Sequence, residues 1–599
     1  MNIQNRSEIS KEDKWNLEKI YATLEDFNND INKFHQELDN LVYLQKDFLN
    51  SSLELANFLK QDEKVSRLLE KLSVYANCKN DEDKNNSTNQ ELKGKIINLY
   101  AEYNEKTAAV IPRILKTDEK IINQYIEEQE SLKSYKHFFD VIFSKKDHTL
   151  DESIEKVLSL YQPVFSSNSQ TASYLTNADL NLGKIKDEDN NEIELTEANY
   201  SNYISSANRN IRQSAFTALY GAYNSIINTL ASTYSTTVNK DCITSKLRNY
   251  KNSISMYLEA NKIPVELYNN LIKVVSENLE PLYDYYELKR NILNLDEFHL
   301  YDSYAKIVKE NKKKYSFEDA KNIVINALSV YGDEYIKILK TAFTDGWIDK
   351  YPNKGKKSGA YSTGSIDTMP YVLLNFTEDY NDVSTLAHEL GHSMHTYFTT
   401  KNNPYITADY PIFLAEIAST TNELLLSDYM YKNSNNKEEK LSILNERLDL
   451  FKATIYRQTM FAEFEKDAHS YVESGNILTK DYLNKMYYDL NKKYFGNKVV
   501  VDDEIKYEWA RIPHFYTPFY VYQYATSLSI SCYVAENIIN NTPDFVNKYL
   551  AFLQSGGRDY PLEVLKIIDI DLKDTKVFES AIEYFKNTLE EFKKIYYEK

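Results

Sequence analysis

The sequence has few of the residues that interrupt helices or cross-link small domains. Among 599 residues there are only 13 Gly and 12 Pro, which favours long helices because few positions break them. The three cysteines, Cys78, Cys242 and Cys532, are odd in number and far apart, so they do not indicate a disulfide framework. No apolar run reaches the roughly 18 residues of a membrane span, and the N-terminal stretch lacks the apolar core of a signal peptide. We therefore expect a cytoplasmic protein that does not enter a membrane.

The overall balance of residues narrows the possible partners. A formal net charge of −18 disfavours nucleic acid and anionic membrane surfaces as binding partners. Hydrophobic residues make up 42% of the chain, which is enough for a large interior. Because the chain is too long for one compact core, we expect two or more lobes in a mainly α-helical fold.

Histidine is scarce, and two of the nine form a metal-binding pattern. The stretch Thr385–His395, TLAHELGHSMH, contains His388, Glu389 and His392 in the order H-E-x-x-H. On a helix, residues four apart share one face, so both imidazoles can bind one Zn²⁺ from the same side. Glu389 lies at the edge of that face, where it can act as the general base toward a metal-activated water. Gly391 removes side-chain bulk beside the predicted metal.

A third protein ligand is needed, and the sequence offers two candidates. His395 lies three residues beyond His392, but three ligands on one rigid helix reach tetrahedral directions poorly. Glu416 is the better candidate, in a predicted second helix over Phe413–Leu424. Glu423 lies two helical turns beyond Glu416, so it can accept the free N–H of a ligand imidazole and fix its orientation. For His395 we expect a supporting role next to the ligands or toward the substrate.

These motifs resemble a known family. The HELGH motif, followed 24 residues after its second His by the Glu of FLAEIASTTNE, resembles oligoendopeptidase F of the M3 family of zinc oligopeptidases, which includes thimet oligopeptidase. The resemblance implies a mainly α, zincin-like metallopeptidase with a helical N-terminal domain. It also implies a small β-sheet beside the zinc helix and a deep substrate channel that admits short, flexible peptides.

A change of pattern near residue 195 suggests a domain boundary. Residues 175–195 alternate in hydrophobicity around a polar Asp-Asn-Asn turn, which predicts a small hairpin. Thr196 then caps a new helix. The order LTNADL, LTEANY and NRNIRQSAF resembles the segment that joins the two domains of oligoendopeptidase F. We therefore predict an N-terminal oligoendopeptidase F-type domain at 1–195 and an M3-type catalytic domain at 196–599.

Residues 343–378 hold four of the 13 glycines and then the best strand candidate, Pro370–Thr377. In zinc peptidases, a strand beside the metal helix often pairs with extended substrate backbone. We predict substrate contacts from Gly359, Ala360 and Tyr371, although the glycines equally fit a plain surface turn.

The stretch 509–531 is rich in Tyr. Thr517 as cap and Pro518 at the first helical position predict the start of a helix. Tyr520 and Tyr524 would then lie four residues apart on one face of that helix.

The family resemblance implies that a His and the tyrosines that follow it stabilise the oxyanion of the tetrahedral intermediate. In this sequence the His is His514, and Tyr524 and Tyr520 are the preferred tyrosines, with Tyr516 as a further candidate. A neutral Tyr or a His can donate the hydrogen bond that this role needs.

Together these features predict an endopeptidase with one Zn²⁺ per chain, held by His388, His392 and Glu416, that cleaves internal bonds of oligopeptides. Co²⁺ or Mn²⁺ remains an alternative metal, although two His and a carboxylate suit zinc. One alternative function is a peptidyl-dipeptidase of the same family, in which Arg511 could hold the substrate carboxylate. Another is an inactive helical peptide-binding protein, against which the intact Glu389 argues.

Overall fold

The computed structural model describes residues 3–309 and 313–598. It confirms a mainly α-helical protein, with two small β-sheets in the described part of the chain. Among the described residues, no helix combines the length and hydrophobicity needed to cross a membrane. The chain packs as two compact units, which we call the first and second unit. The first unit comprises Met1–Lys146, Lys312–Asn433 and Val534–Asp571, and the second comprises Asp147–Asn311, Ser434–Tyr533 and Leu572–Lys599.

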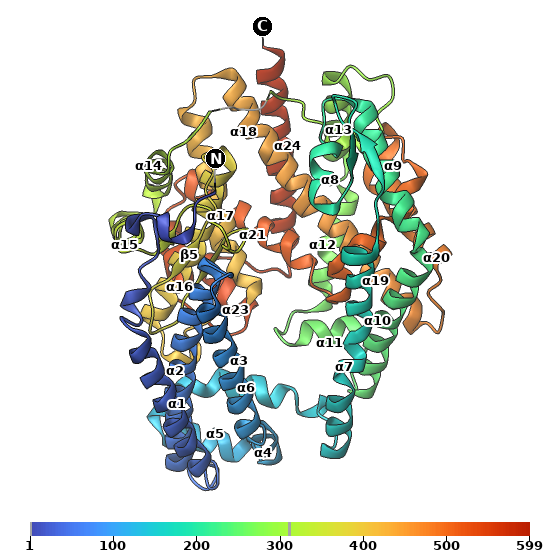
Figure 1. Ribbon diagram of the computed structural model, residues 1–599. Helices are drawn as coiled ribbons and strands as arrows, with labels where there is room; N and C mark the ends of the chain where they lie inside the picture. Colours follow the sequence, from blue (N-terminus) through green and yellow to red (C-terminus); the bar gives the residue numbers. More distant parts are fainter. Residues whose placement is uncertain (1–2, 310–312, 599) are drawn as a thin grey trace. The chain divides into compact units, whose positions relative to one another are not determined.

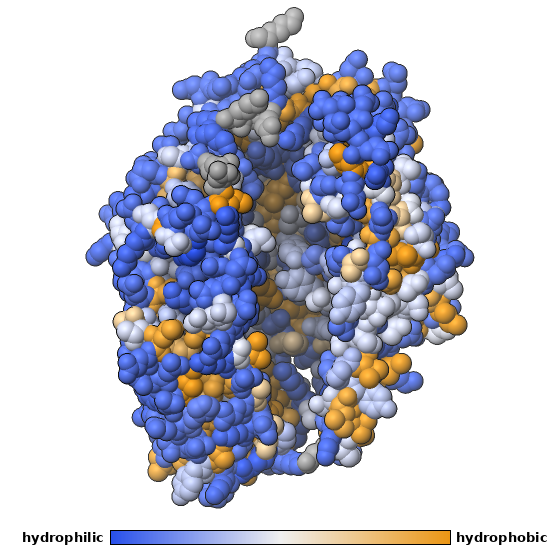
Figure 2. All heavy atoms as spheres, viewed as in Figure 1, coloured by the Kyte–Doolittle hydropathy of each residue, from blue (hydrophilic) through white to orange (hydrophobic). Residues whose placement is uncertain are grey.

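Three long antiparallel helices begin the first unit (Figure 1, lower left). They are α1 (Leu24–Leu44), α2 (Ser52–Glu82) and α3 (Ser87–Thr107). Thr23 starts α1 with a capping box, and Ser51 caps α2 by accepting a hydrogen bond from a first-turn N–H. Their apolar stripes meet in a continuous core, while their outer surface is largely hydrophilic, with small hydrophobic patches (Figure 2).

Further helices complete the first unit. These are α4 (Val110–Lys116), α5 (Glu119–Glu128), α6 (Lys136–Ser144), α14 (Phe317–Ala327), α15 (Asp333–Thr344), α16 (Tyr380–Asn402), α17 (Ile412–Asn433), α22 (Phe545–Leu553) and α23 (Pro561–Leu565).

A three-stranded sheet lies against α16 in the first unit. Its strands are β3 (Ile348–Asp349), β4 (Tyr361–Thr363) and β5 (Tyr371–Leu373), in the order β3-β5-β4. The β3–β5 pair is parallel and the β4–β5 pair is antiparallel. The Ser362 and Ser393 hydroxyls, 2.8 Å apart, connect β4 to α16. The predicted small sheet beside the metal helix is therefore confirmed, but the glycine-rich region holds two strands that the sequence did not reveal.

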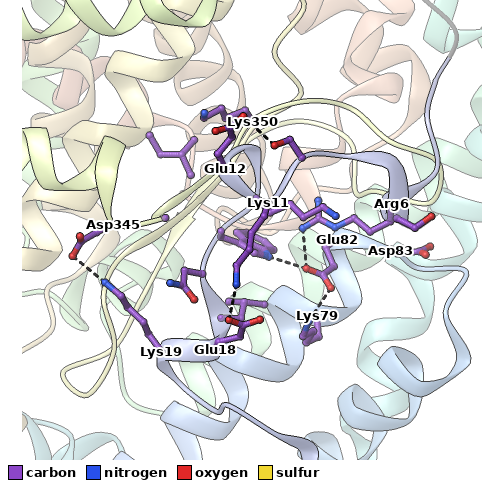
Figure 3. A pocket seen from close by; sticks show the side chains of 18 of the residues that line it. Arg6, Lys11, Glu12, Glu18, Lys19, Lys79, Glu82, Asp83, Asp345 and Lys350 are labelled. Carbon is purple, nitrogen blue, oxygen red and sulfur yellow. Dashed lines mark hydrogen bonds and ion pairs between the residues drawn. The ribbon is translucent and has the colours of Figure 1, made fainter.

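The N-terminal segment anchors this sheet. Arg6 makes two hydrogen bonds to the buried carboxylate of Asp349 in β3, at 2.9 and 2.5 Å, and Lys356 pairs with the same carboxylate at 2.6 Å. Burial raises the pKa of Asp349, but its two cationic partners outweigh burial and hold the pKa below the usual value. The segment borders a cavity of about 1230 Å³, drawn in Figure 3. Several charged residues around this cavity pair with one another, namely Lys19 with Asp345, Lys11 with Glu18, and Arg6 and Lys79 with Glu82.

The second unit begins with helices and the predicted hairpin. Strands β1 (Lys184–Lys186) and β2 (Glu192–Glu194) pair antiparallel, and Thr196 caps α8 (Glu197–Ile204) in a capping box with Asn199, as expected.

The other helices of this unit are α7 (Glu152–Tyr174), α9 (Arg209–Ser225), α10 (Ile227–Leu247), α11 (Ser253–Glu259), α12 (Val265–Glu277), α13 (Glu280–Ile292), α18 (Lys437–Phe451), α19 (Arg457–Glu473), α20 (Lys480–Phe495) and α24 (Lys576–Tyr597). Residues of α21 (Tyr522–Ile539) fall in both units. The domain boundary between residues 195 and 196 stays a prediction, because packing units do not define sequence domains.

Candidate metal centre and active-site residues

The three motif residues His388, Glu389 and His392 lie on α16, as predicted. The helix begins at Asp379, whose carboxylate accepts a hydrogen bond from the Asp382 N–H at 3.0 Å in a capping box. The apolar side of α16 is buried in the first unit, so the helix is held rigidly. A rigid helix fixes the directions of the two imidazoles before any ion binds.

Helix α17 lies directly against α16 and carries the predicted third ligand, Glu416. The contact depends on Gly391, because a Cβ there would lie 2.6 Å from Ser419 Cα and 2.8 Å from Ala418 O. We expected Gly391 to make room beside the metal, whereas the structure shows that it makes room for the backbone of α17. A hydrogen bond also joins the two helices, because Asn422 Nδ2 donates to the Ala387 carbonyl at 3.1 Å.

The side chains of His388, His392 and Glu416 converge. The two Nε2 atoms are 3.2 Å apart, and Glu416 Oε2 lies 3.6 Å from His388 Nε2 and 3.7 Å from His392 Nε2. Three ligands of a tetrahedral zinc, each about 2.05 Å from the ion, are separated by about 3.3 Å. The observed triangle is close to that value, so the residues fit a single small divalent ion. Among the described residues, this is the one group of three or more His, Cys, Asp or Glu residues that has its candidate ligand atoms all within 4.8 Å of one another.

Glu423 lies behind His388. Its Oε1 is 2.5 Å from His388 Nδ1, and its Oε2 accepts from Ser384 Oγ at 3.3 Å. Burial lowers the pKa of His388, but the hydrogen bond and charge of Glu423 outweigh burial and raise the pKa to about 9. Because Nδ1 donates to Glu423, Nε2 is the ring nitrogen on the side of Glu416. Once Nε2 is deprotonated, its lone pair is available to bind a metal.

His392 has a different electrostatic setting. Burial, followed by the nearby charge of His388, lowers the pKa of His392 to about 4. A hydrogen bond with the backbone of Ala415 holds the ring. A neutral, oriented imidazole is the form that binds a metal.

Glu389 is placed as a proton acceptor. Its side chain is 6% exposed, and no hydrogen bond joins its carboxylate to another described residue. Burial, reinforced by the charges of Glu416 and Glu423, raises the pKa of Glu389 to about 7. A carboxylate with a pKa near neutrality can both accept and return a proton at that pH.

His395 lies on the buried side of α16. Its ring is 1% exposed and stacks on Tyr410 at 3.7 Å between centroids, with Phe552 on its other side at 5.4 Å. Burial lowers its pKa to about 3, so the ring is neutral. Its Nδ1 has no hydrogen-bond partner among the described residues. This placement gives His395 a packing contact and leaves its predicted supporting role a prediction.

The expectation for Tyr371 requires correction. Its side chain is fully buried, donates a hydrogen bond to the Asn16 carbonyl at 3.1 Å and packs edge-on against Trp15. Both edges of its strand, β5, are paired, because β5 is the central strand of the sheet. Neither the side chain nor the β5 backbone is free to bind an extended peptide.

Gly359 and Ala360 precede the edge strand β4. Gly359 is exposed with φ +79°, a conformation that glycine adopts without strain, and its carbonyl accepts from Asn375 Nδ2 at 2.8 Å. Within the described part of the chain, β4 pairs only with β5, so its other edge is free of strand partners. The first unit therefore places these two residues beside an edge of the sheet where backbone pairing remains possible.

The second unit gathers His514, Tyr520 and Tyr524 into one cluster. His514 Nε2 is 3.3 Å from the Tyr524 hydroxyl, and the rings of Tyr520 and Tyr524 meet edge-on at 5.5 Å. Burial lowers the pKa of His514, which favours the neutral ring. The hydroxyl of the further candidate, Tyr516, is instead engaged with Thr233 Oγ1 at 2.7 Å.

The helix predicted to start at Thr517 begins at Tyr522 instead, so Tyr520 lies in the preceding turn. Phe519 adopts φ +53°, which interrupts the helical path. The Phe519 N–H donates to Glu465 Oε1 at 2.7 Å, and Glu465 is buried. A Glu in a helix usually lies at the surface, so no signal in the sequence marked Glu465 as a buried acceptor.

Comparisons with known proteins agree with this site. The sequence profile of "Peptidase family M3" matches residues 202–584, and that of "Oligopeptidase F" matches residues 113–181. Oligopeptidase PepF of Bacillus subtilis (strain 168) is 40% identical over 593 residues, which cover 99% of this chain and 88% of that protein. An oligoendopeptidase F homolog of Lactococcus lactis subsp. lactis (strain IL1403) is 38% identical over 99% of this chain and 98% of its own length.

A solved structure is similar as well. The crystal structure of oligoendopeptidase-F from Enterococcus faecium superposes with a TM-score of 0.74 at 32% identity, over 95% of this chain and 99% of that one. The resemblance that the motifs indicated is thereby confirmed. The chain belongs to peptidase family M3, with oligoendopeptidase F, and is a metallopeptidase that hydrolyses peptide bonds of oligopeptides.

Proposed function

We propose that the protein is a zinc endopeptidase with one Zn²⁺ per chain, bound by His388, His392 and Glu416. The observation that carries this proposal is the triangle of ligand atoms, with sides of 3.2, 3.6 and 3.7 Å. When bound, zinc supplies a Lewis acid that lowers the pKa of water and polarises a peptide carbonyl. Glu423 holds His388 in the tautomer that presents Nε2 to the ion.

Glu389 is the general base in this proposal. Its carboxylate accepts a proton from the water that attacks the scissile carbonyl, and then passes that proton to the leaving amine nitrogen. A pKa of about 7 supports both steps, because it lies close to the working pH of a cytoplasmic enzyme. Cytoplasmic location is itself part of the proposal.

His514 and Tyr524, together with Tyr520, are proposed to donate hydrogen bonds to the oxyanion. Their rings form one cluster in the second unit, and the lowered pKa of His514 leaves its ring neutral. Removing one such donor typically slows catalysis by about 100-fold or more.

Substrate backbone is proposed to pair with the free edge of β4, beside Gly359 and Ala360, rather than with β5 at Tyr371. Backbone pairing recognises extended peptides with little dependence on side chains. We retain the sequence division into domains at 1–195 and 196–599 as part of the proposal.

The test is cleavage of an internally quenched peptide, blocked at both termini, by wild type and Glu389→Gln, with bound metal quantified in each. We expect internal cleavage by wild type, lost by at least about 1000-fold in the variant, while one zinc per chain is retained. Glu25→Gln, an exposed carboxylate in the first turn of α1, is the matched control and should behave as wild type.

The blocked peptide also separates the alternatives. A peptidyl-dipeptidase needs a free substrate carboxylate and would leave this peptide intact while cleaving its unblocked counterpart. Arg511, the candidate for holding that carboxylate, is already paired with Glu197 at 2.5 Å. A wild-type protein that binds zinc but cleaves no peptide of either kind would refute the enzyme and favour a peptide-binding protein.

A further inference from the structure

A second cavity lies wholly within the second unit and shares no residue with the proposed catalytic machinery. Its volume is about 520 Å³, in the range of small-molecule sites. Helices α8, α13 and α19 and the end of α20 form its walls, which are mainly aromatic and aliphatic. The exposed side chains of Ser201 and Tyr304 mark its opening, and Ile204 and Leu282 lie buried inside.

The charged residues that line this cavity are all cations. They are Lys452, Arg457 and Arg511, and no acidic side chain is among the lining residues. Each cation is held by a carboxylate that does not itself line the cavity, respectively Asp449, Glu508 and Glu197. The three cationic side chains nevertheless remain between 15% and 26% exposed, so part of each stays accessible. This one-sided lining is unexpected in a chain with a net charge of −18.

Three tyrosine hydroxyls in the wall lack partners. No hydrogen bond joins the hydroxyl of Tyr200, Tyr286 or Tyr456 to any other described residue, although the rings are 6%, 2% and 1% exposed. The Tyr456 hydroxyl is fully buried and unsatisfied. A buried hydroxyl without a partner, as at Tyr456, is costly, and the unpaired hydroxyls of Tyr200 and Tyr286 remain accessible to a polar group in the cavity.

The backbone also departs from regularity here. Residues Lys452–Tyr456 form a turn of π-helix between α18 and α19, and Lys452, Ala453 and Tyr456 of this turn line the cavity. Such π-turns occur frequently at functional sites, because the wider turn redirects side chains. The turn presents a cation, a small residue and the side chain of Tyr456 to the same space.

We propose that this cavity binds a small organic anion with a flat apolar body, as in an aromatic carboxylate. The aromatic walls pack against the apolar body of the ligand. Tyr286 and Phe495, whose rings stack at 5.0 Å between centroids, form part of these walls. The cations and unpaired hydroxyls hold the anionic group. A zwitterionic amino acid fits worse, because no lining carboxylate would meet its ammonium group.

The test uses three probes of nearly equal size with the zinc-loaded, full-length protein. They are 3-phenylpropionate, its neutral amide 3-phenylpropanamide, and the cation phenethylamine. Binding is followed by saturation-transfer NMR and by calorimetry. We expect a Kd of about 1 mM or lower for the acid, binding at least about tenfold weaker for the amide, and no transfer to the amine.

Two variants locate the binding. Ala453→Trp fills the cavity from an exposed position and should abolish binding of the acid. Tyr286→Phe removes one unpaired, accessible hydroxyl and should weaken binding by about threefold to tenfold. Tyr234→Phe is the matched control, because Tyr234 is equally buried with an unsatisfied hydroxyl in the same unit but does not line the cavity.

Each outcome decides for or against the proposal. Unchanged binding of the acid in Ala453→Trp would place the acid elsewhere, for instance at the zinc, and would overturn the proposal. Amine binding as tight as acid binding, or no transfer to the acid at about 10 mM, would overturn it too. None of these readouts depends on peptide cleavage, so they stand apart from the proposed function.

Discussion

Gly391→Ala should separate the two helices that hold the metal ligands. A Cβ at this position would lie 2.6 Å from Ser419 Cα, whereas carbon atoms in contact prefer about 3.5–4.0 Å. The atoms nearest to this Cβ are backbone atoms of α17, which cannot rotate away, so the helices must part locally by about 1 Å. His392 follows Gly391 directly, and Glu416 lies on α17 one turn before Ser419.

The consequence for the metal follows from the ligand distances. The gap between His392 Nε2 and Glu416 Oε2 is 3.7 Å and would widen toward about 4.7 Å, whereas a tetrahedral zinc needs about 3.3 Å. We expect zinc affinity to fall by about tenfold or more. The free energy of unfolding should fall by up to about 2 kcal/mol, since overpacking costs about 1–3 kcal/mol and replacing a helical Gly by Ala returns about 1 kcal/mol.

The assay is a zinc-chelator competition titration, together with urea unfolding of the same preparations. Gly221→Ala is the matched control, because Gly221 lies within α9 and a Cβ there meets nothing within 4 Å. The control should keep wild-type zinc affinity and gain up to about 1 kcal/mol of stability. Wild-type zinc affinity in Gly391→Ala would refute the reasoning that this close helix contact sets the ligand geometry.

Two further predictions concern the carboxylates of Glu423 and Glu465. Glu423→Gln should weaken zinc binding by about 10–100-fold in the same titration, because the amide holds His388 Nδ1 less strongly; an unchanged affinity would exclude this role. Burial raises the pKa of Glu465 well above its usual value, so the stability that its bound proton confers is full below about pH 4.3 and is lost as pH rises toward the folded-state pKa. Glu465→Gln keeps an acceptor for the Phe519 N–H but has no carboxyl proton to lose. The free energy of unfolding of this variant, measured in urea relative to wild type, should therefore increase between pH 5.5 and 7.5, by at most about 1.4 kcal/mol per pH unit. A difference that does not change with pH would contradict the raised pKa.

Local signals in the sequence were sufficient for several features. The four-residue spacing of His388 and His392 predicted a shared helix face, and few Gly and Pro predicted a helical protein. The hairpin before residue 195 and the cap at Thr196 were also predictable, because turn and capping preferences act over a few residues. The family could be named for the same reason, since its motifs are short and local.

Tertiary contacts decided the rest. Strand β5 appeared suited to bind substrate, but β3 and β4, which precede it in the same glycine-rich region, occupy both its edges. Packing buries Glu465 against the Phe519 N–H, and the helix expected at Thr517 gives way to the turn that this hydrogen bond holds. Such features depend on which segments meet in space, and local sequence carries little record of that pairing. The sequence alone determined the metal-binding motif and the family, whereas long-range packing determined the sheet order, the ligand triangle and the cationic cavity of the second unit.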